Sequence, residues 1–270
     1  TNIKTRNSFV KAIQKEIKAN SIEILSAFQV ESALPEGRAN GELQRTLDQI
    51  ERFIELLKEG SFIQATLNTN GLDLRKMLYP IGPIVVFGAS NFPLAFSTAG
   101  GDTISALAAG CPVVVKTHPY HAGTSELVAQ AIHLAIKKSK VPTEAFSHLG
   151  GQSHELGMSL VSHPLVKGVG FTGSFTGGKS LFDLVQQREE PIPFFAEMGS
   201  VNPVFILENK VKKDSTLPTA LASSITLGTG QFCTNPGLIV ICDSDPETEF
   251  AIHLGEAMES LELEPMVHSK

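Results

Sequence analysis

The sequence contains few cysteines and no excess of positive charge, and each of these absences excludes a class of protein. Its three cysteines, Cys111, Cys233 and Cys242, are an odd number in 270 residues, which argues against a disulfide framework and favours a reducing compartment. With 22 Lys and Arg against 28 Asp and Glu, the net charge is -6, so there is no electrostatic basis for binding nucleic acid or an anionic membrane. We expect a small-molecule partner instead.

Long apolar runs and clustered metal ligands are also missing. The first thirty residues carry charges throughout, so we expect no secretory signal. The least charged stretch, residues 97–115, holds Asp102, three glycines and a proline, whereas a membrane span needs about 20 apolar residues. The eight histidines lack metal-ligand spacing, so we expect no metal. We therefore expect a cytoplasmic protein without a membrane span.

Apolar spacing predicts a helical first quarter followed by an α/β region. Residues 9–17 and 43–57 have the spacing of amphipathic helices, and residues 32–40 are expected to form a loop. Short apolar runs predict strands, with helical patterns between several of them: strands at 84–87, 113–115, 166–171, 204–207 and 238–242, and helices at 125–137, 177–187 and 216–227. This alternation predicts a mainly parallel sheet with helices on both faces.

Ligands bind at the carboxyl ends of strands in such sheets, and three loops there are unusual. After residues 84–87 comes Asn91, whose amide suits an oxyanion, although asparagine in a turn more often bonds its own backbone. Lys116 follows residues 113–115 and suits ribose or phosphate oxygens, or is a solvated surface lysine. Residues 171–178 offer glycines and a helix amino terminus to a phosphate. No G-x-G-x-x-G motif follows any strand, so a standard Rossmann site is not supported.

Cys233 differs from the other two cysteines in its context. It lies in a loop, residues 228–237, whereas Cys111 and Cys242 adjoin apolar runs, where a thiol is usually a small buried hydrophobe. Glu197 ends an apolar run. Apolar surroundings disfavour the charged form of a carboxyl group and so raise its pKa, toward the value that suits a general base near neutral pH. For a single glutamate, however, a salt-bridged or solvated state is the commoner outcome.

Together and in this order, the motifs resemble the aldehyde dehydrogenase superfamily. The matching segments are the Asn91 motif at 91–93, the cofactor-ribose lysine motif at 112–116, the pyrophosphate turn at 171–174, the glutamate motif at 197–203 and the cysteine motif at 230–233. The resemblance implies an α/β fold with an atypical Rossmann-like parallel sheet, helices on both faces, and the beginning of a second α/β catalytic domain. We expect a cofactor-binding domain with the amino-terminal helices at residues 1–207 and a partial catalytic domain at 208–270.

The resemblance also implies covalent catalysis by Cys233. Its thiolate would attack an aldehyde, Asn91 and the Cys233 N–H would hold the oxyanion, and Glu197 would activate the water that hydrolyses the thioester. These three groups are expected to converge on one carbonyl carbon. The residues expected at the cofactor are Lys116, Thr117, His118, Phe171, Thr172, Gly173 and Ser174.

Departures from the family pattern bear on cofactor and substrate. Members often carry a glutamate three residues after the lysine, where this chain has Pro119; losing that carboxylate removes a repulsion against a 2′-phosphate. We therefore predict NADP, or both NADP and NAD, with Thr117, His118 and His154 near the phosphate. Residues 87–103 are most similar to the branch of α-ketoglutaric semialdehyde (2,5-dioxopentanoate) and NADP-dependent fatty-aldehyde dehydrogenases, which favours a semialdehyde, with a fatty aldehyde as the alternative.

Family members continue well beyond the position matched by Lys270, through most of the catalytic domain and a strand used for oligomerisation. We therefore expect a truncated chain whose full-length parent is a homo-oligomer. A catalytically incomplete cofactor-binding domain is one alternative function. A CoA-acylating enzyme is a second alternative. Glu197 argues against it, because this residue would activate water, and not CoA, to take the acyl group.

Overall fold

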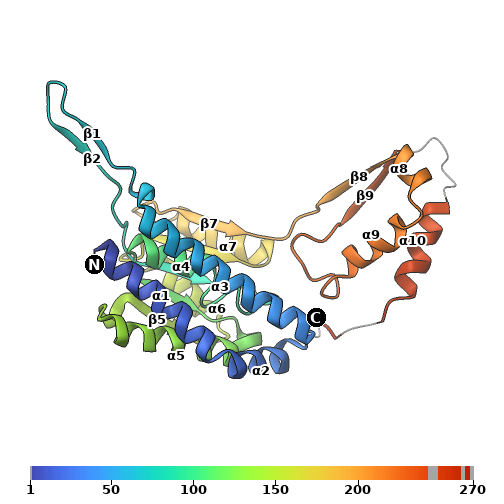
Figure 1. Cartoon of the computed structure of the whole chain (residues 1–270), viewed down its shortest axis with the longest axis horizontal. Helices are drawn as coiled ribbons and strands as arrows, with labels where there is room; N and C mark the ends of the chain where they lie inside the picture. Colours follow the sequence, from blue (N-terminus) through green and yellow to red (C-terminus); the bar gives the residue numbers. More distant parts are fainter. Residues whose placement is uncertain (1, 243–248, 263–264, 268–270) are drawn as a thin grey trace. The chain divides into compact units, whose positions relative to one another are not determined.

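The computed structural model describes residues 2–242, 249–262 and 265–267. The chain forms two compact units, Thr1–Glu197 and Met198–Lys270, which we call unit 1 and unit 2. Figure 1 shows their elements along the chain. The predicted domain boundary between residues 207 and 208 stays a prediction.

Unit 1 contains a five-stranded sheet in which every neighbouring pair is parallel. In the order β5-β4-β3-β6-β7, the strands are β5 (Phe146–Leu149), β4 (Val113–Lys116), β3 (Ile84–Phe87), β6 (Gly168–Thr172) and β7 (Phe194–Glu197). Phe87 pairs with Lys116 and with Phe171, so the carboxyl ends of these strands lie at one edge of the sheet. The predicted parallel sheet is confirmed.

Helices cover both faces of this sheet. On one face lie α1 (Ile3–Ala19), α2 (Ser21–Ser32), α3 (Glu36–Glu59), α4 (Gly101–Ala109) and α5 (Ala122–Ser139), which share a core with the strand residues Val86, Val115 and Phe146. On the other lie α6 (His154–Ser162) and α7 (Phe175–Gln186), where Phe182 of α7 packs against Phe194. Short 3-10 helices occur at Ser61–Ile63, Pro119–His121 and Thr143–Ala145.

The amphipathic pattern of α3 is confirmed, but the loop predicted before it is largely helix. Each of the apolar residues that set the α3 pattern is buried: Leu43, Leu47, Ile50, Ile54 and Leu57. The loop between α2 and α3 is only residues 33–35, not 32–40, and Pro35 is the residue immediately before α3. Proline and glycine near a helix start are tolerated because the first N–H groups have no partner within the helix. Gly37 therefore lies in the first turn of α3.

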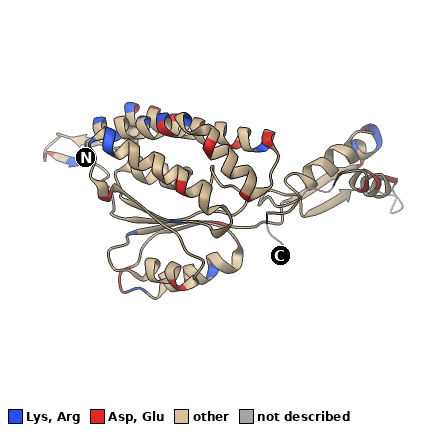
Figure 2. Ribbon diagram, turned by 90° about the horizontal axis from the view of Figure 1, so that it is seen from below, with Lys and Arg blue, Asp and Glu red and all other residues tan. Residues whose placement is uncertain are grey.

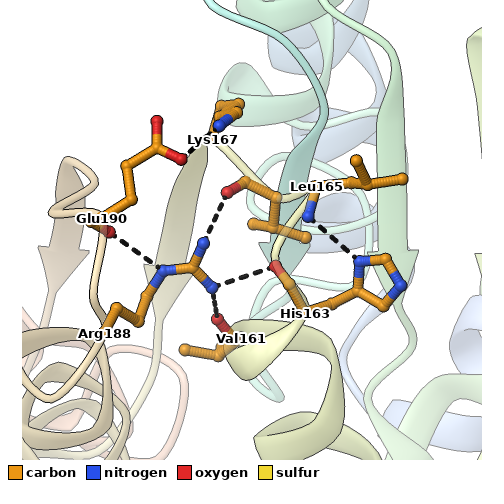
Figure 3. Close-up of polar contacts among 7 residues, drawn as sticks. Val161, His163, Leu165, Lys167, Arg188 and Glu190 are labelled. Atoms are coloured by element: carbon orange, nitrogen blue, oxygen red, sulfur yellow. Dashed lines mark hydrogen bonds and ion pairs between the residues drawn. The ribbon is translucent and has the colours of Figure 1, made fainter.

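Arg188, after α7, fastens the connection between α6 and β6 (Figure 3). Its guanidinium donates to the backbone oxygens of Val161 at 2.6 Å, His163 at 3.0 Å and Val166 at 3.0 Å, and to that of Glu190 at 3.4 Å. The carbonyl groups of Val161, His163 and Val166 lie at and after the end of α6, where the last carbonyl groups of a helix have no N–H partner within it. These bonds fix the chain immediately before β6, and the predicted pyrophosphate turn follows the carboxyl end of that strand.

Unit 2 contains a parallel pair of strands, β8 (Pro203–Leu207) and β9 (Leu238–Cys242). Its helices are α8 (Glu208–Lys213), α9 (Leu217–Thr226) and α10 (Glu249–Glu259). Ile206, Leu221 and Phe250 form its buried cluster. The strands predicted at 204–207 and 238–242 and the helix at 216–227 are confirmed to within a residue at each end.

Unit 1 also carries an exposed antiparallel hairpin. The hairpin, β1 (Thr66–Asn68) and β2 (Leu74–Lys76), belongs to unit 1, and its residues are exposed. Acidic and basic residues lie side by side along the helices (Figure 2). Among the described residues, no helix combines the length and the apolar character needed to cross a membrane.

Candidate active site

Several residues singled out from the sequence lie at the carboxyl edge of the sheet in unit 1. Lys116 is the last residue of β4, Thr172 the last of β6 and Glu197 the last of β7. Asn91 follows β3 within residues 88–96, which we call the asparagine loop, and Ser174 precedes α7. Residues distant in sequence thus share one edge, which is where parallel sheets bind ligands. Their individual roles stay predictions.

A buried carboxylate from α3 holds the asparagine loop. Oε1 of Glu42 accepts hydrogen bonds from the backbone N–H groups of Leu94 and Ala95, both at 2.9 Å. Its other oxygen lies 2.7 Å from Nη1 of Arg38, whose guanidinium also stacks over the ring of Phe92, 4.5 Å from its centroid. Burial raises the pKa of Glu42, and the charge of Arg38 opposes that shift. The loop is therefore anchored through its backbone and through one of its aromatic rings.

A buried histidine holds the same loop from the other side. His121 is fully buried, with Nε2 2.7 Å from the carbonyl oxygen of Ala89 and Nδ1 2.9 Å from Oγ of Ser125. A carbonyl only accepts, so Nε2 carries the proton and Ser125 donates to Nδ1. Burial lowers the pKa of His121. Sequence reasoning missed both this residue and Glu42, because their partners in the loop are distant in sequence.

The residues predicted near the cofactor ribose differ in exposure. Lys116 is half-buried, and burial lowers its pKa. Thr117 is buried and its hydroxyl bonds Nε2 of His148, whose Nδ1 lies 3.4 Å from a carboxylate oxygen of Glu126. His118 is half-buried at the start of a 3-10 helix. The Thr117 side chain thus faces the interior, whereas Lys116 and His118 keep exposed area.

The turn between β6 and α7 has the features expected of a phosphate site. Oγ of Ser174 caps α7, a helix of 12 residues, by accepting from the N–H of Gly177 at 3.2 Å. The remaining first-turn amides have no partners within the helix, and the helix dipole there favours an anion. A Cβ on Gly173 would meet the ring of Phe171 at 2.8 Å, so any other residue there would require that ring to shift. His154, also predicted near the phosphate, is exposed at the start of α6.

Glu197 lies on the α4 face of the sheet, close to a second carboxylate. A Cβ on Gly170 would meet Oδ2 of Asp102 at 2.9 Å, so that carboxyl packs over β6. Thr172, two residues after Gly170, pairs with Glu197, which places Glu197 on the same face. The pKa of Asp102 is raised, first by burial and then by the charge of Glu197. Glu197 itself is exposed, because Phe194 and Ala196 alternate to the other face of β7 and Phe195, on its own face, is 69% exposed. The apolar surroundings predicted for Glu197 are therefore not found.

Cys233 lies in unit 2, half-buried in a loop of residues 228–237 between α9 and β9, which we call the cysteine loop. Three successive residues before it, Gly228, Thr229 and Gly230, have φ angles of 60°, 58° and 70°. A left-handed conformation is unfavourable for threonine, which is β-branched. Nδ2 of Asn235 bonds the oxygen of Gly230 at 2.9 Å and braces the turn. The loop context predicted for Cys233 is confirmed.

Of the other two cysteines, the structure describes the side-chain surroundings of Cys111 only. Cys111 is buried, 5% exposed, as predicted for a structural thiol. Cys242 ends β9, but its side chain lies outside the described residues. Of the two thiols whose surroundings the structure describes, Cys233 is therefore the accessible one.

The comparisons with known proteins agree with this arrangement. The family model described as "Aldehyde dehydrogenase family" matches residues 1–269, and the chain therefore belongs to that family. Among curated proteins it is 44% identical to α-ketoglutaric semialdehyde dehydrogenase 2 of Azospirillum brasilense, over 94% of this chain and 50% of that protein. It is also 44% identical to α-ketoglutaric semialdehyde dehydrogenase of Acinetobacter baylyi, over 92% of this chain and 49% of that protein.

Solved structures support the fold. Glyceraldehyde-3-phosphate dehydrogenase GapN from Methanocaldococcus jannaschii, complexed with NADP, superposes with a TM-score of 0.82 at 21% identity, covering 97% of this chain and 55% of that one. An aldehyde dehydrogenase from Bartonella henselae gives a TM-score of 0.79 at 21% identity, covering 95% and 51%. The aldehyde dehydrogenase-like α/β fold is thus confirmed. The chain spans about half the length of the curated relatives it matches.

Proposed function

We propose that this chain contributes the cofactor-binding part and the nucleophile of an aldehyde dehydrogenase that oxidises a semialdehyde, such as 2,5-dioxopentanoate, to the carboxylic acid. The observation that carries the proposal is the 44% identity to two α-ketoglutaric semialdehyde dehydrogenases, over 94% and 92% of this chain. The arrangement of Asn91, Lys116 and Glu197 at one edge of the sheet supports it.

In the proposed reaction, the thiolate of Cys233 attacks the aldehyde carbon and forms a thiohemiacetal. The side-chain amide of Asn91 and the backbone N–H of Cys233 donate to the developing oxyanion. The anchoring of the asparagine loop by Glu42 and His121 supports this role, because a preorganised donor costs no reorganisation during the reaction. A bound nicotinamide cofactor would accept the hydride that leaves the thiohemiacetal carbon.

Glu197 serves the second half of the reaction. It takes a proton from water, the resulting hydroxide attacks the thioester carbon, and the bond to the Cys233 sulfur breaks to release the acid and regenerate the thiol. Overall, the aldehyde and water yield a carboxylate and two protons, and the hydride reduces the cofactor. The exposure of Glu197 supports access by water.

NADP is the proposed cofactor, with NAD accepted as well. Lys116 and His118 would face the adenosine ribose and its 2′-phosphate, and the amino terminus of α7 would face the pyrophosphate. Position 119 is a proline, so the carboxylate that would repel a 2′-phosphate there is absent. The half-buried position of Lys116 supports a strong charge-assisted contact.

Turnover of 2,5-dioxopentanoate tests the reaction, with formation of reduced cofactor followed optically and CoA omitted. We expect acid product that disappears in Cys233→Ala, while Glu197→Gln should accumulate a thioester on Cys233 that mass spectrometry detects. A fatty aldehyde of matched reactivity serves as the comparison substrate. Cofactor binding without turnover, in both this chain and the complete reading frame that contains it, would show a binding module and contradict the proposal.

Calorimetric titration with NADP and with NAD tests the cofactor. Lys116→Ala should weaken NADP binding by about 10- to 100-fold, the worth of one charge-assisted hydrogen bond. Lys140→Ala, which removes a lysine outside the proposed site, is the control and should leave binding unchanged. A clear preference for NAD would contradict the cofactor assignment while leaving the aldehyde chemistry intact.

A further inference from the structure

We propose that Asn202 is a positioning residue for Cys233. Its side-chain amide fixes the backbone of the cysteine loop, so that the Cα of Cys233, from which the thiol and the N–H both project, keeps one position. The inference rests on the proposed role of Cys233, but the contacts that carry it lie entirely within unit 2.

The amide of Asn202 makes two short hydrogen bonds to the cysteine loop. Nδ2 donates to the carbonyl oxygen of Cys233 at 2.6 Å and to that of Asn235 at 3.0 Å. The carbonyl groups belong to residues 31 and 33 positions further along the chain. Nδ2 also lies 3.5 Å from the oxygen of Ser200, the longest of its three contacts. Because an amide nitrogen carries only two hydrogens, the two shorter bonds, to the residues on either side of Thr234, are the main ones.

The backbone around Asn202 shows why asparagine suits this position. Its φ is 46°, in the left-handed region that asparagine tolerates better than most other residues. The N–H of Gly237 donates to the oxygen of Val201 at 2.9 Å, and a Cβ on Gly237 would lie 2.8 Å from that oxygen. Strand pairing then begins with Pro203 and Leu238. The cysteine loop is thus held at its nucleophile and again at its exit.

Fixing the Cys233 carbonyl limits rotation about the Cα–C bond of the nucleophile. The left-handed turn at residues 228–230 limits the chain on the other side of Cys233. Together they hold the backbone on both sides of Cys233, and with it the position from which the sulfur and the N–H must both address one carbonyl. Asn202 belongs to the glutamate motif, residues 197–203, so the motif that supplies the proposed base also supplies a hold on the nucleophile.

Two substitutions separate the amide from the backbone conformation. Asn202→Gly keeps the left-handed conformation without strain and removes the donor. Asn202→Asp keeps the shape but turns an oxygen toward two carbonyl oxygens. Ala would confound the test, because it adds a left-handed penalty of about 1 kcal/mol or more. Ser223→Ala is the control, since it removes one hydrogen bond within α9 of the same unit, to the oxygen of Thr219.

Three measurements distinguish positioning from folding. In Asn202→Gly we expect kcat for the aldehyde to fall by about 10- to 100-fold, as expected for a misplaced reacting group, with a much smaller change in KM. Asn202→Asp should fall further. Alkylation of Cys233 by iodoacetamide, followed on its peptide, should change far less than kcat, because it needs a thiolate but no aligned N–H. The ¹³C resonance of the Cys233 carbonyl should shift in both variants and not in Ser223→Ala.

The outcomes separate this inference from the proposed function. An unchanged kcat in Asn202→Gly, equal falls in turnover and alkylation, or an unmoved Cys233 carbonyl resonance would each overturn the positioning role. If the wild-type protein turns over no aldehyde, the proposed function fails. The carbonyl resonance then decides by itself whether Asn202 holds the cysteine loop.

Discussion

The two units differ in how much apolar surface supports their functional residues. Unit 1 has an extensive core in which side chains as large as Phe28 and Phe146 are 0% and 1% exposed. Among the residues of unit 2 that the structure describes, the buried core cluster comprises Ile206, Leu221 and Phe250, with partly buried hydrophobic residues packed against it. We therefore expect unit 1 to be the more stable support for Asn91 and the proposed cofactor residues, and unit 2, which carries Cys233, to be the less stable unit.

The sheet of unit 2 also buries little apolar surface. Within the described residues it has two strands, and Phe205 and Leu207 of β8 are 66% and 67% exposed. A two-stranded sheet is marginally stable unless its apolar face is covered. We therefore expect unit 2 to open at a lower free energy than unit 1. Single substitutions in each unit can test this contrast.

The largest effect is expected from truncating a core side chain of unit 1. Phe146→Ala should lower the free energy of unfolding of unit 1 by about 3–5 kcal/mol, because a nearly inaccessible ring leaves a cavity. Phe250→Ala in unit 2 should leave the unfolding of unit 1 unchanged and raise hydrogen exchange only in unit 2. Amide hydrogen exchange, measured residue by residue at increasing urea concentration, gives the free energy of unfolding of each unit. Equal effects of both variants on unit 1 would contradict the contrast.

The next effect concerns the anchor of the asparagine loop. Glu42→Ala leaves two buried N–H groups without an acceptor and Arg38 without its partner, which should cost about 3–5 kcal/mol. Glu42→Gln keeps one oxygen for those N–H groups and should cost less. Glu55→Ala, at an exposed position of α3, is the control. A loss in Glu42→Ala no larger than in the control would show that the anchor is not needed.

A smaller effect, and one that depends on pH, is expected at His121. Its folded-state pKa is lowered by burial, so below about pH 6.5, the pKa of free histidine, the unfolded chain binds a proton that the folded one resists. Stability should therefore fall as the pH drops below that value. His121→Gln should flatten this part of the profile of unfolding free energy against pH, whereas His154→Gln should not. Parallel wild-type and His121→Gln profiles would rule the histidine out.

The smallest effect should be stabilising and confined to unit 2. Thr229→Gly removes a left-handed β-branched residue and a buried hydroxyl that has no partner among the described residues. The gain should be about 1 kcal/mol, since left-handed backbone costs roughly that much for non-glycine residues. Hydrogen exchange in α9 and β9 should slow while that of unit 1 stays the same. Faster exchange in unit 2 would refute this account of the turn.

The sequence predicts the central strands of the sheet better than its two outermost strands. The strands predicted at 84–87 and 113–115 lie in the interior of the sheet and are confirmed, because strands buried on both faces form continuous apolar runs. The edge strands β5 and β7 were not predicted. In β5 only Phe146 is fully buried, and β7 alternates half-buried and exposed residues. Without a continuous run, such strands resemble loops in sequence.

Local patterns by themselves determined the alternation of helices and strands, the amphipathic face of α3 and the loop positions of Asn91 and Cys233, because burial repeats with the period of the element. Only the tertiary structure decided what holds those loops. Glu42 reaches 52 residues to Leu94, His121 reaches 32 to Ala89, and Asn202 reaches 31 to Cys233. Each is a single polar residue whose partner is fixed by how the chain folds back, and no periodicity records such a pairing.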